Sequence, residues 1–332
     1  MSFIHRGLAA DGGIRVIAAD TTDLVADATR RHGTRATAGA ALGRTLTGSL
    51  LLSHVLLKKP EDRVTVKING DGPLGGIIAE AGLDGSARGY VAHPHVDPPI
   101  RDDGKLNVGA AVGTRGTIEV TRSHAPYGEP FSSAVDLMSG EVAEDVAGYL
   151  ARSEQIASAV LLGVYFEAET VHTAGGVILQ AMPDADPAAL TLLEANVKAL
   201  GALTDSLRER SLIDTMHELT WGLDMHLMTD ADKPLPVRYA CRCSDEKALE
   251  ALAYFSLEER EAMIAQDGGA EAVCHWCGET RWVTPEQIRS LGDGTGEVRC
   301  PDCQTLWYRP GVTTMVRDGE ICSCGRPVEL PN

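Results

Sequence analysis

The strongest constraint in this sequence is a set of four cysteines near its carboxyl end. The pair Cys241-Arg-Cys243 is followed by thirty residues and then by Cys274-His-Trp-Cys277. Thiolates one or two residues apart can reach one ion from a tight turn, and two such turns complete the tetrahedral shell of structural zinc. Gly278 comes next, where such a turn often needs a positive φ. The spacing therefore predicts a zinc site made by these four cysteines.

Disulfides are the alternative use of an even number of cysteines. Stable disulfides need an oxidising compartment. Residues 1–6 have no apolar signal core and run into the polar Asp11-Gly-Gly, so we expect a cytoplasmic protein with reduced thiols. Zinc is therefore favoured over permanent disulfides. His275 lies inside the second cysteine turn, and we expect its imidazole to point outward rather than to bind the metal.

Length and charge narrow the class of function. A chain of 332 residues suggests two to three domains. The net charge of −17 argues against nucleic acid and anionic membranes, because basic surface supplies most of the affinity for phosphate backbones. The longest apolar stretches, 50–57 and 157–166, are far shorter than the roughly 18 residues that span a bilayer. We expect neither nucleic-acid nor membrane partners.

Residues 1–183 are predicted to form an α+β domain with a mixed sheet packed by helices. Strict alternation in 63–69 indicates a half-buried strand. The segment 70–75 matches a dinucleotide-binding pattern, but Pro73 and the strand-like residues after it favour a hairpin connection. Other strands are expected at 13–19, 76–79, 88–91, 106–109, 116–121, 130–135, 159–167 and 174–181. Helices are expected from Thr21 or Thr22, over 34–57, which is rich in small residues, and over 139–151 with Ser139 as its cap.

A helical linker is predicted over 184–238. Apolar residues recur every three or four positions from Leu190 to Leu207, which predicts one amphipathic helix. Ser211 is expected to begin a second helix. Packing against the first domain is the simplest role for both helices, and it does not exclude a functional one.

The small metal domain is predicted over 239–292. Its three short helices contain few large apolar residues, so metal binding must replace much of a hydrophobic core. The helices are expected to begin at these capping residues: Ser244, Ser256 with Glu259, and Thr284 with Gln287.

The remaining residues, 293–332, contain a second cysteine set in mirrored order. Cys300-Pro-Asp-Cys303 is followed after eighteen residues by Cys322-Ser-Cys324. This pattern is typical of a zinc ribbon, so one zinc is expected in the chain and a second is possible. A dithiol that is oxidised on its own is an alternative. So is a hybrid site in which the first pair of the chain meets Cys300 and Cys303.

The chain resembles the heat shock protein 33 family, the redox-regulated bacterial chaperonin, over about residues 10–292. The cysteine spacing matches the family's zinc signature. Further matches occur in chain order: Gly70-Asp-Gly-Pro-Leu-Gly75, Gly89-Tyr-Val91, Gly104-Lys-Leu-Asn-Val-Gly109, Ser139-Gly-Glu141, Tyr149, Ser153-Glu-Gln155, Ala159-Val160, Leu162-Gly-Val164 and Ala174-Gly-Gly176. The resemblance implies an ATP-independent holdase, not an enzyme, that is inactive when reduced and zinc-bound. It also implies activation by oxidation with unfolding stress, a metastable linker, unfolded client proteins as partners and a homodimer when oxidised.

The direction of such a switch follows if oxidation removes zinc and pairs Cys241 with Cys243 and Cys274 with Cys277. Structural zinc contributes about 10–16 kcal/mol at neutral pH, whereas each short disulfide loop contributes about 2 kcal/mol. The metal domain should then melt and loosen the linker helices. The side chains expected to bind clients are Leu193, Val197, Leu200, Leu203, Ile213, Met216 and Trp221.

Two other classes of function fit the cysteines less well. A thiol–disulfide oxidoreductase could use Cys274 and Cys277 or Cys300 and Cys303, but neither pair opens a helix in a thioredoxin-like βαβ pattern. A zinc-ribbon protein that binds nucleic acid is opposed by the charge. Turnover in an insulin-reduction assay would favour the oxidoreductase. A salt-dependent gel shift would favour the nucleic-acid-binding protein.

Overall fold

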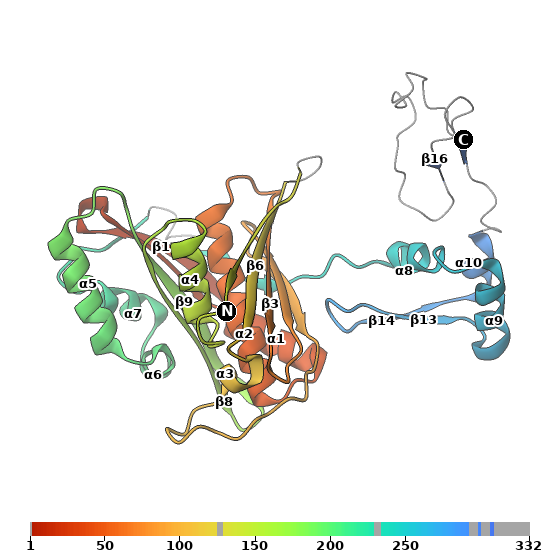
Figure 1. Ribbon diagram of the computed structural model, residues 1–332, viewed down its shortest axis with the longest axis horizontal. Helices are drawn as coiled ribbons and strands as arrows, with labels where there is room; N and C mark the ends of the chain where they lie inside the picture. Colours follow the sequence, from red (N-terminus) through yellow and green to blue (C-terminus); the bar gives the residue numbers. More distant parts are fainter. Residues whose placement is uncertain (1, 125–128, 229–233, 292–297, 300–305, 309–332) are drawn as a thin grey trace. The chain divides into compact units, whose positions relative to one another are not determined.

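The computed structural model describes residues 2–124, 129–228, 234–291, 298–299 and 306–308 (Figure 1). The chain divides into two compact units, Met1–Cys241 and Arg242–Asn332. The α+β class predicted from the sequence is confirmed, while the finer division into four segments stays a prediction. No helix among the described residues is long and apolar enough to cross a membrane.

The first unit contains two sheets, A and B, in which most strand pairs are antiparallel, and sheet A joins the two ends of the unit. Its strands, in spatial order, are β10 (His226–Leu227), β1 (Phe3–Ala9), β2 (Ile14–Asp20), β9 (Thr170–Ala181) and β8 (Ser158–Glu167), and β11 (Leu235–Pro236) also pairs with β1. The strand β1 was not predicted, although β2, β8 and β9 were. Its partners β10 and β11 lie in the segment predicted to be a helical linker, so part of that segment is sheet.

Sheet B follows the alternation that predicted it. Its order is β12 (Arg238–Tyr239), β5 (Ser86–Val91), β4 (Ile77–Gly82), β3 (Arg63–Gly70), β6 (Gly116–Ser123) and β7 (Phe131–Asp136). The apolar residues of β3 are buried, and its polar residues are not. The glycine-rich segment after β3 leads directly into β4, with positive φ at Gly75 and Gly76, which confirms a hairpin connection.

The helix α2 (Ala36–Leu56) is the centre of the first unit. It packs against strands of both sheets and is buried along most of its length. Gly43 permits close packing, because a Cβ there would lie 2.6 Å from Val25 Cγ1 of α1 (Thr22–His32) and 2.9 Å from Val164 Cγ2 of β8. The prediction of a core helix rich in small residues is confirmed.

Two predictions between β5 and α4 (Ala143–Arg152) were wrong. Residues 106–109 do not extend the sheet, since Val108–Val112 is the short helix α3, capped by the Asn107 side chain. Ser139 does not cap the next helix, α4 (Ala143–Arg152). Instead the buried Asp145 carboxylate accepts hydrogen bonds from the amides of residues 138, 139, 140 and 142. A residue inside the first turn of α4 therefore fixes the segment that leads into the helix.

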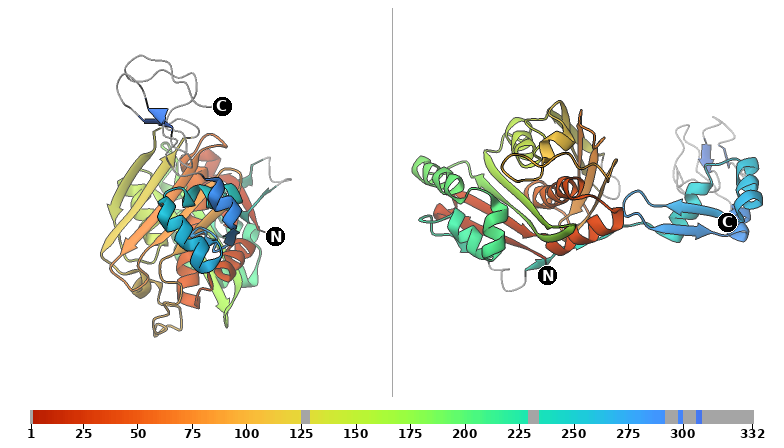
Figure 2. Two further views of the ribbon diagram at one scale, coloured as in Figure 1. Left: turned by 90° about the vertical axis from the view of Figure 1, so that its right-hand side faces the viewer. Right: turned by 90° about the horizontal axis from the view of Figure 1, so that it is seen from below.

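Three helices cover the other face of sheet A: α5 (Pro187–Leu200), α6 (Leu203–Glu209) and α7 (Leu212–Leu219) (Figure 2). A second hydrophobic core lies between them and strands β2 and β9. The predicted single helix from Leu190 to Leu207 is wrong, because Gly201 breaks it with φ 68° and ψ −123°. Ser211 caps α7 as predicted.

The described part of the second unit is a hairpin with three short helices. These are α8 (Asp245–Leu252), α9 (Leu257–Asp267), β13 (Ala270–Val273), β14 (Thr280–Val283) and α10 (Pro285–Ser290), followed by the paired strands β15 (Val298–Arg299) and β16 (Leu306–Tyr308). All three predicted helix caps are confirmed. Among these described residues, the buried core comprises Leu252, Ala270, Val283 and Ile288, and five other apolar residues are partly buried against it.

Candidate metal centre

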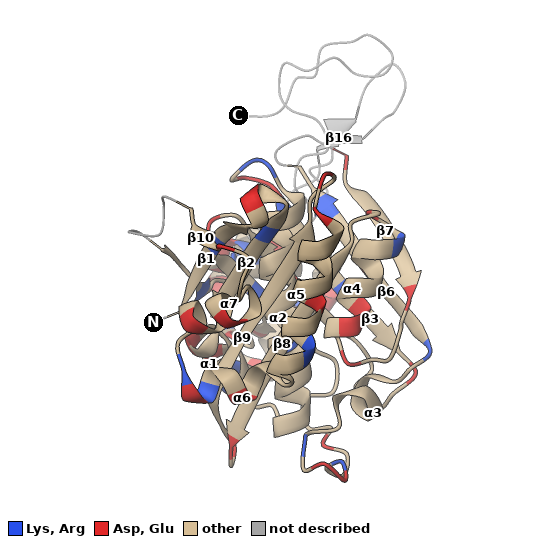
Figure 3. Cartoon of the chain, turned by 90° about the vertical axis from the view of Figure 1, so that its left-hand side faces the viewer, with Lys and Arg blue, Asp and Glu red and all other residues tan. Residues whose placement is uncertain are grey.

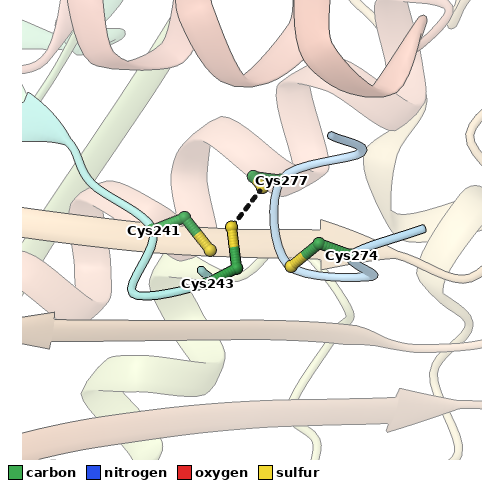
Figure 4. Close-up of side chains that lie close together, drawn as sticks. All are labelled: Cys241, Cys243, Cys274 and Cys277. Carbon is green, nitrogen blue, oxygen red and sulfur yellow. Dashed lines mark hydrogen bonds between the residues drawn. The ribbon is translucent and has the colours of Figure 1, made fainter. Parts of the chain in front are cut away.

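The structure brings together the first four cysteines of the chain. Their sulfur atoms all lie within 4.8 Å of one another, and Cys243 Sγ is 3.6 Å from Cys277 Sγ. Figure 4 shows the sulfurs of Cys241 and Cys243 facing those of Cys274 and Cys277 across a small gap. With zinc–sulfur bonds of about 2.3 Å, tetrahedral ligands lie about 3.8 Å apart. The four thiols, none of them in a disulfide, therefore fit one tetrahedral ion.

The second cysteine turn is built by backbone hydrogen bonds. Gly278 N donates to Cys274 O over 2.7 Å, and Cys274 N donates to Glu279 O over 3.0 Å. Gly278 has a φ of 69°, which confirms the predicted need for glycine after the turn. The turn joins β13 to β14, so the hairpin ladder presents both sulfurs on one side. His275 is exposed and lies outside the cluster of ligand atoms, as expected.

The first cysteine turn leaves sheet B directly. The strand β12 runs parallel to β5, and Ala240 N donates to Ala87 O over 2.9 Å. The next residue, Cys241, receives a hydrogen bond from the Arg88 guanidinium at 3.9 Å. Arg88 also binds the Glu80 carboxylate at 3.2 Å. Burial lowers the pKa of Arg88, but Glu80 and the Cys241 sulfur outweigh it and raise that pKa above its ordinary value.

A second arginine contacts the same cysteine pair. Arg281, on β14, donates to Cys243 Sγ over 3.7 Å and pairs with the Asp245 and Glu279 carboxylates. Hydrogen bonds to Asp245 and then to Cys243 raise the pKa of Arg281. Four thiolates and one divalent ion carry a net charge of −2, so two guanidinium groups oppose the excess.

Sequence reasoning missed both arginines. Arg88 is separated from Cys241 by 153 positions, and nothing near it in the sequence marks a partner for sulfur. Arg281 could have been proposed as a partner for a thiolate, because it follows Cys277 by four positions in the sequence. The tail cysteines Cys300, Cys303, Cys322 and Cys324 lie outside the described residues. Cys241 and Cys243 meet Cys274 and Cys277, whereas the hybrid site considered above would bring them to Cys300 and Cys303.

The side chains expected to bind clients separate into two groups. Leu193, Leu203 and Met216 are buried in the second core, and Val197 and Leu200 are partly buried against it. Ile213 is partly exposed, whereas Trp221 lies beyond α7 with 76% of its surface exposed.

The helix α5 carries few charges on its outer side (Figure 3). Beside it is an apolar hollow of about 460 Å³, lined by Leu193, Val197 and small residues of β8 and α4. The linker helices thus keep most of their apolar side chains against sheet A and leave a smaller apolar surface open.

Comparisons with known proteins agree on one family. Residues 2–284 match the model of the Hsp33 protein family. The chain is 53% identical over 340 aligned positions to the 33 kDa chaperonin of Thermus thermophilus, and the match covers 100% of this chain and 98% of that protein. It is 49% identical to the 33 kDa chaperonin of Deinococcus radiodurans, with 87% of this chain and 97% of that protein covered.

A crystal structure of the 33 kDa chaperonin from Thermotoga maritima has the same fold, with a TM-score of 0.79 and 31% sequence identity. The similarity covers 87% of this chain and 96% of that chain. The family model ends before residues 293–332, whereas the Thermus match includes them.

Proposed function

The chain belongs to the Hsp33 family and is an Hsp33-type chaperone, and we propose that it is a redox-regulated, ATP-independent holdase. In this proposal the reduced, zinc-bound chain is inactive. Oxidation to disulfides releases the metal, melts the metal domain and loosens the linker helices. The active form then binds unfolding proteins and acts as a homodimer in the cytoplasm, without an enzymatic reaction.

One observation carries the proposal. Among the described residues of the region that holds the cysteine cluster, the buried core consists of four apolar residues, one of them an alanine, with five others partly buried against it. Fully burying a Val, Leu or Ile side chain contributes about 1.5–3 kcal/mol, so the three large residues contribute about 5–9 kcal/mol. Structural zinc contributes about 10–16 kcal/mol. The folded state of this region therefore depends more on the metal than on its core.

The proposed chemistry consumes one oxidant for each disulfide. A pair of neighbouring thiolates, Cys241 with Cys243 or Cys274 with Cys277, gives up two electrons as the sulfur–sulfur bond forms. Hydrogen peroxide accepts the two electrons, takes two protons from solvent and leaves as two waters. When bound, zinc supplies a cross-link between the two cysteine turns. Disulfide sulfurs are poor ligands, so oxidation and metal retention oppose each other.

The proposed client surface is the apolar side of the linker helices. The partly buried Val197 and the neighbouring hollow contribute an open part, and Trp221 adds an exposed aromatic ring. Loosening of α5–α7 would add the buried side chains of the second core and the face of sheet A beneath them. Apolar patches of this kind are what an unfolded chain with exposed apolar residues binds.

A thermal aggregation assay tests the proposal. The reduced, zinc-loaded chain should leave aggregation of an unrelated client protein unchanged, and the peroxide-treated chain should suppress it near equal molar amounts without ATP. A variant with serine in place of the four tail cysteines is the matched control, and it should still switch. Equal activity of the reduced and oxidised chains would contradict the proposal. Turnover in an insulin-reduction assay would instead favour an oxidoreductase.

Metal analysis of the reduced chain tests the second cysteine set. We propose that Cys300, Cys303, Cys322 and Cys324 bind a second zinc, as the mirrored spacing predicts. Two zinc ions per chain, falling to one in the tail variant, would support this. One zinc in both proteins would contradict it.

A further inference from the structure

The amino-terminal residues, the turn before β5 and the strand β12 come together just before Cys241. Residues 237–241, called here the clasp, run along the edge of sheet B beside β5. Val237 N donates to Ser2 O over 2.9 Å, and Arg238 N donates to Gly85 O over 3.0 Å. The clasp therefore ties the amino terminus to sheet B and ends on a metal-site thiol.

Tyr239 fixes the middle of the clasp. Its hydroxyl group donates to Gly89 O over 3.1 Å and lies 3.3 Å from His32 Nε2. The Arg31 guanidinium lies 5.3 Å from the centre of the ring. None of these three contacts involves a sulfur atom. Oxidation of the cysteines therefore does not remove them directly.

The end of the clasp is held differently. Arg88 projects from β5, and its side chain is only 13% exposed, like that of its partner Glu80. The same guanidinium reaches Cys241 Sγ at 3.9 Å. A hydrogen bond from a guanidinium to a thiolate is charge-assisted, whereas a disulfide sulfur carries no charge to accept it. Through this contact, sheet B can respond to the state of the Cys241 thiol.

We propose that Arg88 is a positioning residue for the metal site, which uses the Glu80 pair to hold a positive charge against Cys241 and so fastens the clasp to sheet B only while that sulfur is a thiolate. The inference rests on the proposed zinc-dependent switch and deepens it. Loss of the thiolate charge would release the end of the clasp, and release would spread toward β11 and β10, the strands that precede it along the chain.

The geometry explains why an arginine suits this position. Its guanidinium has several donors in a fixed plane, so it can bind Glu80 through two nitrogens and still present one to sulfur. Residues that hydrogen-bond to metal ligands change metal affinity by about 10–100-fold when they are removed. The expected effect of Arg88 is therefore measurable as zinc loss.

The test compares zinc transfer from reduced, zinc-loaded full-length variants to a chromophoric chelator at neutral pH. Arg88→Met should release zinc at least about tenfold faster than the parent. Arg88→Lys keeps the charge and should restore part of the difference. Arg122→Met is the matched control, because Arg122, on β6 of the same sheet, forms a similar largely buried pair with Glu154 but contacts no described sulfur. It should release zinc at the parental rate.

Two more variants separate the sulfur contact from the carboxylate pair. Glu80→Gln keeps Arg88 and keeps an oxygen that accepts a hydrogen bond from it, so this variant should release zinc no faster than about twofold above the parent. The double variant Glu80→Gln/Arg88→Met leaves no unpaired carboxylate, yet it should release zinc as fast as Arg88→Met. In hydrogen exchange, the amide of Ala240 should lose protection in Arg88→Met and keep it in Arg122→Met.

The inference would be overturned if Arg88→Met released zinc at the parental rate, or if Glu80→Gln alone reproduced its effect. This outcome is distinct from failure of the proposed function. An Arg88→Met chain that loses zinc rapidly although the oxidised parent protects no client would support the positioning role and contradict the chaperone switch. If the oxidised parent protected clients but Arg88→Met released zinc at the parental rate, the chaperone switch would be supported and the positioning role contradicted.

Discussion

Truncation of Met216 should activate the chaperone without an oxidant. Met216 lies on α7 with 0% of its surface exposed, and it packs in the core between the linker helices and sheet A. The same core includes Ile14, Val16 and Val177, which are fully buried, so we expect little collapse around a cavity. If the helices cover a client surface, a weaker core should expose that surface while zinc stays bound.

The magnitude follows from the burial. Replacing a buried methionine by alanine costs about 2–5 kcal/mol. Each 1.4 kcal/mol changes an equilibrium tenfold, so the ratio of loosened to docked helices should rise between about 30-fold and about 4,000-fold. Even the lower value should be detectable as dye binding, because the parent chain starts from a small loosened population.

The assay measures hydrophobic-dye fluorescence and suppression of client aggregation by reduced Met216→Ala with its zinc content verified. Met138→Ala is the control, because Met138 is 50% exposed and the same substitution there removes little packing. We expect activity in the reduced Met216→Ala chain and none in Met138→Ala. A Met216→Ala chain that is destabilised toward urea by the expected amount, yet binds neither dye nor client, would refute the covering role of these helices.

Three further predictions concern stability. Cys277→Ser should lose zinc and leave residues 242–291 unfolded while the first unit stays folded, as checked by metal analysis and two-dimensional NMR; a folded, metal-free hairpin would contradict this. Burial, with two nearby arginines, lowers the pKa of His54 from 6.5 to about 4, so its neutral form adds about 3 kcal/mol of stability. That stability is fully present above about pH 6.5 and is lost as the pH falls toward 4. His54→Gln should flatten urea-unfolding midpoints over this range, and an unchanged slope would exclude the group. Gly43→Ala should destabilise the first unit by about 1–3 kcal/mol through its contact with Val25, whereas Gly48→Ala, where the nearest atom is 3.4 Å away, should be neutral or stabilising; equal thermal shifts would contradict the packing argument.

Local signals in the sequence predicted much of the second unit. The capping pairs Ser256 with Glu259 and Thr284 with Gln287 place hydrogen-bond partners three residues apart, so the structure they specify is complete within one helical turn. The cysteine turns are equally local, and Gly278 marks the second of them. The residues of a metal site could therefore be assigned before the fold was known.

Features that depend on distant partners could not be predicted in this way. The strand β1 pairs with β11 from the far end of the first unit, and Arg88 meets Cys241 only because β12 joins β5. The break at Gly201 was hidden because apolar spacing continues across it into α6. The buried Asp145 replaced the expected cap at Ser139, since its carboxylate gathers four amides that no short pattern connects.

Hydrogen–deuterium exchange before and after peroxide treatment tests the central claim most directly, namely that the metal holds the second unit folded and that its loss loosens the linker helices. The account predicts that β13 and β14 lose protection as zinc is released, that α5–α7 lose it as well, and that β2 and β9 keep it. Undiminished protection of β13 and β14 in the zinc-free, oxidised chain would contradict the account.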